Sequence, residues 1–233
     1  MNALVFDATA IQITGPREYQ NDSYRYGADY AVVADGVGSD ISARLAADLA
    51  SNYYSSLTSS RLTVDHLLEA PAAIGSQLLN NPASGSSTVV AALLDSYSRL
   101  WLTAVGDSRY AVIRDGRVLA HNEPHNRASY ARALDPGVPT PFGAESVLTR
   151  SLGGGRRDVA DVRTLATVGG DVVVLMTDGI DAKLTLSRIV EIIGASESPS
   201  AGCSSILEAA AAVSPLDDNA TCLVAFVTER SAQ

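Results

Sequence analysis

Residues 29–40 read DYAVVADGVGSD, an apolar run that ends in an Asp-Gly pair and continues into small residues. The run 29–34 predicts a buried strand, and residues 39–57 place apolar side chains at helical spacing behind a Ser-Asp N-cap signal. An Asp-Gly pair is common in hairpin turns, where a second strand follows. Here a helix-like segment follows instead. Asp35 is therefore a candidate metal ligand as well as a candidate turn residue.

Other apolar runs also carry an aspartate at one end. Asp178 follows VVVLMT, Asp218 precedes ATCLVAFV, and Asp107 follows LWLTAVG. Asp22 precedes the strand that leads to Asp35. In an antiparallel sheet the end of one strand lies beside the start of its neighbour, so these carboxylates can share one rim. Converging carboxylates repel one another unless a cation lies between them, and an all-oxygen ligand set favours Mg²⁺, Mn²⁺ or Ca²⁺.

The order of the predicted elements indicates antiparallel sheet layers covered by helices, an α+β arrangement. Strands are predicted at 3–14, 29–34, 86–95, 99–105, 109–115, 117–121, 171–177 and 220–229. Helices are predicted at 39–57, 63–80, 184–194 and 200–213.

Three local features refine this pattern. Pro71 raises the alternative of a break in the second helix. The strands between 86 and 121 have short links, which suit antiparallel neighbours in a meander, and Asp115-Gly116 is a typical hairpin turn. Residues 122–150 contain four prolines and are expected to form an irregular loop.

Composition excludes several classes of protein. The 233 residues fit one large domain or at most two small ones, and 46% hydrophobic with 18% charged residues can build a core. A net charge of −9 argues against a nucleic-acid partner, which requires a basic surface. No run of about 18 uncharged apolar residues predicts a membrane span. The N-terminal sequence lacks the basic region of a signal peptide, so a cytoplasmic location is expected.

The cysteines and histidines indicate no further metal site. Cys203 and Cys222 have no ligand spacing, and Cys222 lies in an apolar run that predicts a buried thiol. His66, His121 and His125 share no rim position and are interpreted as ordinary surface or loop residues.

Six segments, in chain order, resemble the protein phosphatase 2C family of metal-dependent serine/threonine phosphatases. They are PREYQNDS, VVADGVG, SSTVVAALL with LTAVGDSRYAVIRDGRV, LTRSLG, VVVLMTDGI and DDNATCLV. The resemblance implies a four-layer α-β-β-α sandwich of two antiparallel sheets flanked by helix pairs. It also implies one phosphatase domain over residues 1–233, with two Mn²⁺ or Mg²⁺ ions at one edge of the paired sheets.

The resemblance implies a role for each matched residue. Asp35 would bridge the two ions, the Gly36 carbonyl would ligate one, and Asp178 and Asp218 would hold the other. Asp107 matches the position that helps to hold a third, weaker ion in bacterial members. Its alternative role is to cap a turn.

Two further matched residues concern water and substrate. Asp22 matches a residue that acts through metal-bound water, and Arg17 matches the arginine that grips the substrate phosphate, with a solvated loop residue as its alternative. Arg109 is interpreted as part of a structural ion pair. Asp181 is a candidate for helix capping or catalysis.

The chain also departs from the family pattern. Asn21 stands where many relatives carry Glu, VGSD replaces the usual MGG or HGG, and the Pro-rich segment before LTRSLG is short. These departures concern substrate choice and rate rather than the aspartates.

The resemblance implies hydrolysis of phosphoserine or phosphothreonine in proteins, with the products of a bacterial Ser/Thr kinase as the expected substrates. A pseudophosphatase that acts as a binding module and a phosphatase of small metabolites are the alternatives. No nucleic-acid or membrane partner is expected. The sequence does not indicate an oligomeric state.

Overall fold

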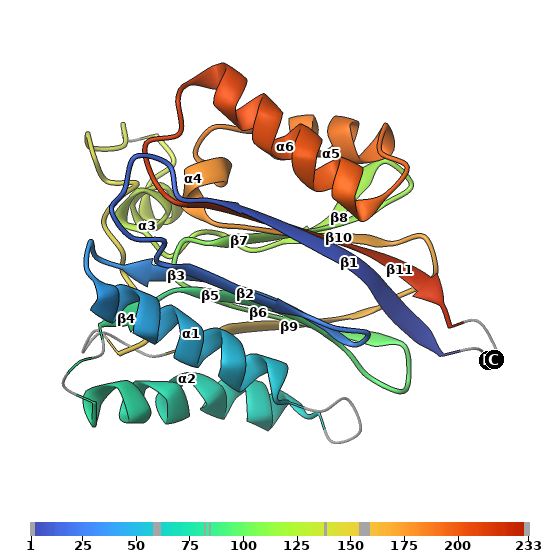
Figure 1. Ribbon diagram of the computed structural model, residues 1–233, viewed down its shortest axis with the longest axis horizontal. Helices are drawn as coiled ribbons and strands as arrows, with labels where there is room; N and C mark the ends of the chain where they lie inside the picture. Colours follow the sequence, from blue (N-terminus) through green and yellow to red (C-terminus); the bar gives the residue numbers. More distant parts are fainter. Residues whose placement is uncertain are drawn as a thin grey trace.

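A computed structural model describes residues 3–57, 62–81, 83, 85–137, 139–153 and 159–230. Two antiparallel sheets pack face to face, and helices cover both outer faces (Figure 1). The predicted α+β class and the four-layer sandwich are confirmed.

One sheet, the β11 sheet, runs in the order β1 (Leu4–Ile13), β11 (Ala220–Glu229), β10 (Val172–Met176), β7 (Arg109–Arg114) and β8 (Arg117–His121). The other, the β3 sheet, runs in the order β2 (Asp22–Tyr26), β3 (Tyr30–Val37), β5 (Val89–Leu94), β6 (Arg99–Val105) and β9 (Asp161–Ala166), and β4 (Ser86–Ser87) pairs with β3.

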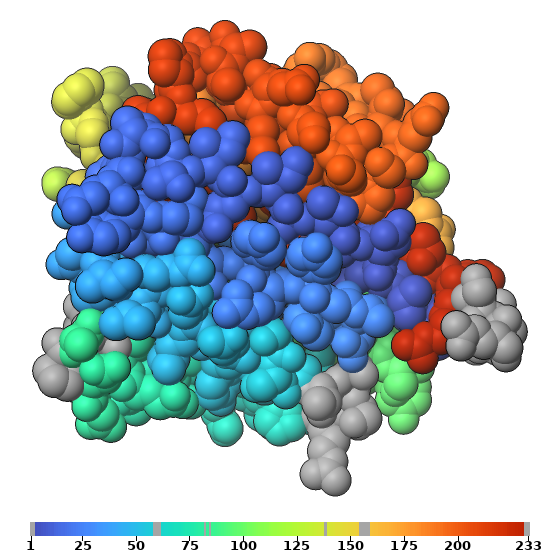
Figure 2. Space-filling model, in the orientation of Figure 1, coloured from blue at the N-terminus to red at the C-terminus, as the bar shows by residue number. Residues whose placement is uncertain are grey.

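Helices α1 (Ile41–Ser55) and α2 (Val64–Leu79) cover the β3 sheet, whereas α5 (Leu186–Gly194) and α6 (Pro199–Val213) cover the β11 sheet (Figure 1). Two short helices, α3 (Arg127–Leu134) and α4 (Asp178–Asp181), lie near one end of the sandwich (Figure 1). In the space-filling view the blue N-terminal segment forms a band between the two helical layers (Figure 2).

Period-two alternation along the strands builds three apolar layers. In β3, Ala31 and Val33 pack between the sheets, whereas Val32 packs against α1 and α2. In β10, Leu175 faces the other sheet and Met176 faces the outer helices. Both central strands are thus buried on both faces, so they read as nearly continuous apolar runs.

One alternative is excluded and one expectation is wrong. Helix α2 continues through Pro71, because Leu67 and Ile74 on either side are buried in the same core and offset the hydrogen bond that proline cannot donate. Residues 122–150 are not wholly irregular, since they contain α3, whose first turn is capped by Asn126 Oδ1 accepting from Ser129 N–H at 2.9 Å.

The predicted meander is also wrong at its centre. Strands β5 and β6 pair, as do β7 and β8, but the two pairs belong to different sheets. The link Gly106–Ser108 therefore crosses from one sheet to the other. Gly106 has φ +97°, and a Cβ atom there would lie 2.5 Å from Thr88 Cγ2, so the crossing requires glycine. The hairpin predicted at Asp115-Gly116 is confirmed.

Cys203 and Cys222 are free and buried, as expected for Cys222. In the described part of the chain, no helix has the length and apolar character needed to cross a membrane.

Candidate metal centre

Three aspartates from different parts of the fold converge at one end of the sandwich. Asp35 lies in β3, Asp107 in the crossing link, and Asp178 at the first residue of α4. Each offers a carboxylate oxygen, and these oxygens lie within 4.8 Å of one another. The sequence predicted that the aspartates lie on the rim of a single sheet. In the structure they lie on a rim that is shared by both sheets.

The electrostatics of this cluster fit a bound cation. Burial, and then the charge of Asp178, raise the pKa of Asp107 to about 7. Burial, followed by Asp22 and Asp178, raises the pKa of Asp35 well above its usual value, and burial with Asp218 raises that of Asp178. A set of crowded oxygen ligands whose charges oppose one another suits a hard divalent cation such as Mn²⁺ or Mg²⁺.

The glycine after each strand-end aspartate allows another backbone segment to approach closely. A Cβ atom on Gly36 would lie 2.3 Å from Ala43 O, and one on Gly179 would lie 2.1 Å from Asn219 O. Both contacts are with backbone, which cannot swing aside. The Asp-Gly pairs at 35 and 178 are therefore not hairpin turns. They place a carboxylate at a crowded junction of strands and helices.

The cluster opens into a cavity of about 610 Å³. Its lining contains every predicted site residue except Asp22: Arg17, Asp35, Gly36, Asp107, Asp178 and Asp218. Arg17 donates through Nη2 to Asp218 Oδ2 at 2.5 Å, so the candidate phosphate ligand lies directly beside a candidate metal ligand. Asn21, Ser146 and Leu148 also line the cavity.

Asp22 is buried behind the cavity, directly opposite Asp35 in the β2–β3 pairing. Its Oδ2 atom accepts from Thr177 Oγ1 at 3.0 Å and from Thr221 Oγ1 at 2.7 Å. Its Oδ1 atom has no hydrogen-bond partner among the described residues. Burial raises the pKa of Asp22 to about 6. The unpartnered oxygen is compatible with the water-mediated role that the sequence suggested.

A hydroxyl bridge that sequence analysis missed joins the two ligand-bearing segments. Asp35 N–H donates to Thr88 Oγ1 at 3.1 Å, and Thr88 Oγ1 lies 2.7 Å from Ser108 Oγ. Thr88 N–H also donates to Asp35 O at 2.8 Å. The SST segment before β5 lies within a segment that the resemblance included, but no spacing pattern showed its contacts.

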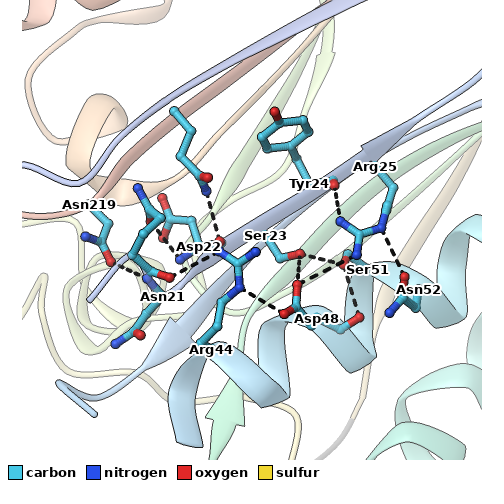
Figure 3. A network of polar contacts seen from close by, with 12 residues as sticks. Asn21, Asp22, Ser23, Tyr24, Arg25, Arg44, Asp48, Ser51, Asn52 and Asn219 are labelled. Carbon is cyan, nitrogen blue, oxygen red and sulfur yellow. Dashed lines mark hydrogen bonds and ion pairs between the residues drawn. The ribbon is translucent and has the colours of Figure 1, made fainter. Parts of the chain in front are cut away.

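The loop that carries Arg17 is fastened from two sides (Figure 3). From α1, Arg44 Nη1 donates to Gln20 O at 3.1 Å and to Asp22 O at 2.6 Å. From the segment before β11, Asn219 Oδ1 accepts from Asn21 N–H at 2.7 Å. The position of the loop is therefore set by α1 and by the neighbour of Asp218.

Three charged or titratable residues near the cluster can be compared with their expected roles: Arg109, Asp181 and His125. Arg109 Nε lies 3.0 Å from Asp181 Oδ2, which confirms the structural ion pair predicted for Arg109. Asp181 is the last residue of α4, whose N-cap is Thr177, so Asp181 does not cap it. His125, interpreted as an ordinary surface or loop residue, is only 7% exposed and contacts Gly106 beside Asp107. His66 is exposed.

Comparisons with known proteins identify the family and the fold. A sequence profile described as Protein phosphatase 2C matches residues 19–205. The fold is similar to that of the serine/threonine phosphatase PstP/Ppp of Mycobacterium tuberculosis, which is 24% identical with a TM-score of 0.81 over 97% of this chain and 100% of the other. No curated protein sequence matches the chain.

Two further solved structures carry the same fold. The catalytic domain of PstP in complex with two manganese ions is 25% identical with a TM-score of 0.78, over 97% of this chain and 100% of that domain. Stp1 of Staphylococcus aureus is 19% identical with a TM-score of 0.81, over 95% of this chain and 94% of the other.

Proposed function

The chain belongs to the protein phosphatase 2C family of metal-dependent serine/threonine phosphatases, and on that premise we propose that the acidic cavity is its active centre. The reaction is hydrolysis of phosphoserine or phosphothreonine in protein substrates, with Mn²⁺ or Mg²⁺ as cofactor. The observation that carries the assignment is the convergence of Asp35, Asp107 and Asp178, whose oxygens lie within 4.8 Å of one another.

In this proposal each acidic residue has a defined task. Asp35, the Gly36 carbonyl, Asp178 and Asp218 would hold two ions, and Asp107 would contribute to a third. When bound, the ions supply an activated water and Lewis acids for in-line displacement at phosphorus. Asp22 orients water through its unpartnered Oδ1 atom, while Thr177 and Thr221 hold its other oxygen in place.

Arg17 binds the substrate phosphate. A guanidinium group presents a planar fork that matches two phosphate oxygens, and it stays charged at any working pH. Arg17 lies at the cavity edge, and its ion pair with Asp218 keeps it oriented towards the centre. Because the loop before β2 is fastened to α1 and to Asn219, the arginine has a defined position before substrate arrives.

We also propose a biological setting for this reaction. Residues 1–233 form one phosphatase domain that works in the bacterial cytoplasm on proteins phosphorylated by a Ser/Thr kinase. The net charge of −9 supports a protein rather than a nucleic-acid partner.

The test is hydrolysis of p-nitrophenyl phosphate and of a phosphothreonine peptide near neutral pH, with Mn²⁺ and in parallel with EDTA. We expect turnover that requires Mn²⁺ and is lost in Asp178→Asn, a variant that should remain folded by circular dichroism. Full activity in Asp178→Asn would contradict the site. No turnover by folded wild-type protein would favour a binding module, and turnover confined to a panel of phosphorylated metabolites would favour a metabolite phosphatase.

A further inference from the structure

We propose that His125 is a positioning residue of the metal centre, which holds the crossing link so that Asp107 reaches the cation. The inference rests on the role proposed above for Asp107. In this role His125 strengthens the binding of metal at the centre but does not contact the reacting atoms.

Two hydrogen bonds join His125 to Gly106, and a third joins His125 to Thr149. Gly106 N–H donates to His125 Nδ1 at 3.1 Å, and His125 N–H donates to Gly106 O at 2.8 Å. His125 O accepts from Thr149 N–H at 2.8 Å. The residue therefore ties the link that carries Asp107 to the segment 146–149, part of which lines the cavity.

The hydrogen bond from Gly106 fixes the tautomer of the His125 ring, whereas Nε2 faces both an acceptor, Asp161, and a donor, Arg150. Because Gly106 N–H is a donor, Nδ1 must carry a lone pair, so the proton of the neutral ring lies on Nε2. Nε2 lies 3.0 Å from Asp161 Oδ2, a carboxylate oxygen that can only accept from it. Arg150 Nη1 donates to Asp161 Oδ1 at 2.6 Å and keeps this carboxylate ionised.

The same geometry explains why loss of Asp161 would disturb the metal ligand. Arg150 Nη1 also lies 3.2 Å from His125 Nε2. Without the carboxylate, Arg150 becomes a donor to Nε2, and the ring proton must then move to Nδ1. There it would face the Gly106 N–H, so two donors would oppose each other beside Asp107.

The link cannot adapt easily to that change. Gly106 holds φ +97° and lies against Thr88, while Ser108 O accepts from Asn122 Nδ2 at 3.0 Å. Asp107 lies between these two fixed points. A shift of the Gly106 peptide is therefore passed to the Asp107 carboxylate rather than absorbed elsewhere.

The test compares two amide substitutions at one position. His125→Asn places an acceptor oxygen where Nδ1 was, whereas His125→Gln reaches the Nε2 position and leaves Gly106 N–H without its acceptor. We expect the Mn²⁺ concentration for half-maximal activity to rise at least about tenfold in His125→Gln and less than about threefold in His125→Asn. Maximal kcat at saturating Mn²⁺ should stay within about threefold of wild type in both. His66→Gln is the matched control, since His66 is an exposed histidine of α2.

Two readouts do not depend on turnover. Mn²⁺ affinity is measured from the paramagnetic resonance signal of free Mn²⁺, and exchange of the Gly106 amide hydrogen is measured in EDTA. We expect weaker Mn²⁺ binding and faster Gly106 exchange in His125→Gln than in His125→Asn. Equal Mn²⁺ affinity in these two variants and wild type would overturn the inference.

A second pair of variants keeps the test decisive if position 125 tolerates no change. Asp161→Ala should weaken Mn²⁺ binding about threefold or more, and adding Arg150→Ala should recover part of the loss, because the donor that misdirects the ring proton is gone. Wild-type affinity in Asp161→Ala would contradict the tautomer argument.

Asp107→Ala separates the two proposals. If it leaves Mn²⁺ binding unchanged, the proposed role of Asp107 fails, whereas a loss there with none in His125→Gln overturns the His125 inference alone.

Discussion

Replacing Asp107 by asparagine should stabilise the metal-free protein, although the residue is a proposed ligand. Asp107 is 7% exposed, and burial together with the charge of Asp178 raises its pKa from the usual 3.8 to about 7. Each pKa unit corresponds to about 1.36 kcal/mol, so ionised Asp107 costs the folded state at most about 4 kcal/mol. Burying the asparagine amide retains part of this cost. The free energy of unfolding should therefore rise by about 1–3 kcal/mol in Asp107→Asn.

The pH dependence gives this prediction its sign. Because the folded pKa exceeds the unfolded one, folding favours the protonated carboxyl. The associated stability is present below about pH 4 and is lost as the pH rises through about 7. The gain from Asp107→Asn should therefore be full at pH 8 and nearly absent at pH 4.5. For a domain of this size it corresponds to a rise in Tm of roughly 3–9 °C at pH 8.

The assay is thermal unfolding of both proteins in EDTA at the two pH values, repeated at pH 8 with saturating Mn²⁺. Mn²⁺ should stabilise the wild type more than Asp107→Asn. The difference in Tm between the two proteins should therefore shrink or change sign. A variant less stable than wild type at pH 8 in EDTA would refute the reasoning. The same gap at both pH values would show that charge is not its cause.

Three further substitutions probe the site and the frame. Arg17→Ala should raise KM for a phosphopeptide about tenfold or more, measured at saturating Mn²⁺ because Arg17 also pairs with Asp218; an unaltered KM would count against phosphate binding. Gly36→Ala should lower Tm and Mn²⁺ affinity together, because the added Cβ would meet Ala43 O; wild-type values for both would show that the backbone adapts. Asp171→Asn should cost about 2 kcal/mol at pH 7, measured by urea unfolding, because Asp171 accepts from Arg114 at 2.6 and 2.7 Å. Burial acts to raise the pKa of Asp171, but the hydrogen bonds from Arg114 and Thr167 lower it. The stability that the ionised carboxylate contributes should therefore be lost as the pH falls below about 4. If the destabilisation by Asp171→Asn does not shrink in acid, the ion pair is contradicted.

Much of the frame was predictable because central strands carry strong local signals. The strand at 220–229 was predicted with its observed bounds, since its residues are buried on both faces and read as a continuous apolar run. Strands β2 and β9 were missed. Their sequences DSYRY and DVRTLA are polar and partly exposed at sheet edges, so pairing with a neighbour rather than composition makes them strands.

The aspartates of the site could be predicted, but their supports could not. Asp35, Asp178 and Asp218 stand at strand ends, which is a local feature of the sequence. That the link at Asp107 crosses between sheets depends on how the sheets pack, and a three-residue link reads like any tight turn. His125 is identified only by its contacts with Gly106 and Asp161, which lie 19 and 36 residues away.

The pairing of β1 with β11 limits when this protein can finish folding during its synthesis. Leu4 pairs with Glu229 and Ile13 with Ala220, so β1 pairs with a strand that is made more than 200 residues later. Asp218 belongs to the same late segment. A nascent chain can complete the β3 sheet and its two helices once β9 is made, but it cannot close the metal centre until β11 arrives. Contacts of such long sequence separation are slow to form, so catalytic competence should appear as the last event of folding.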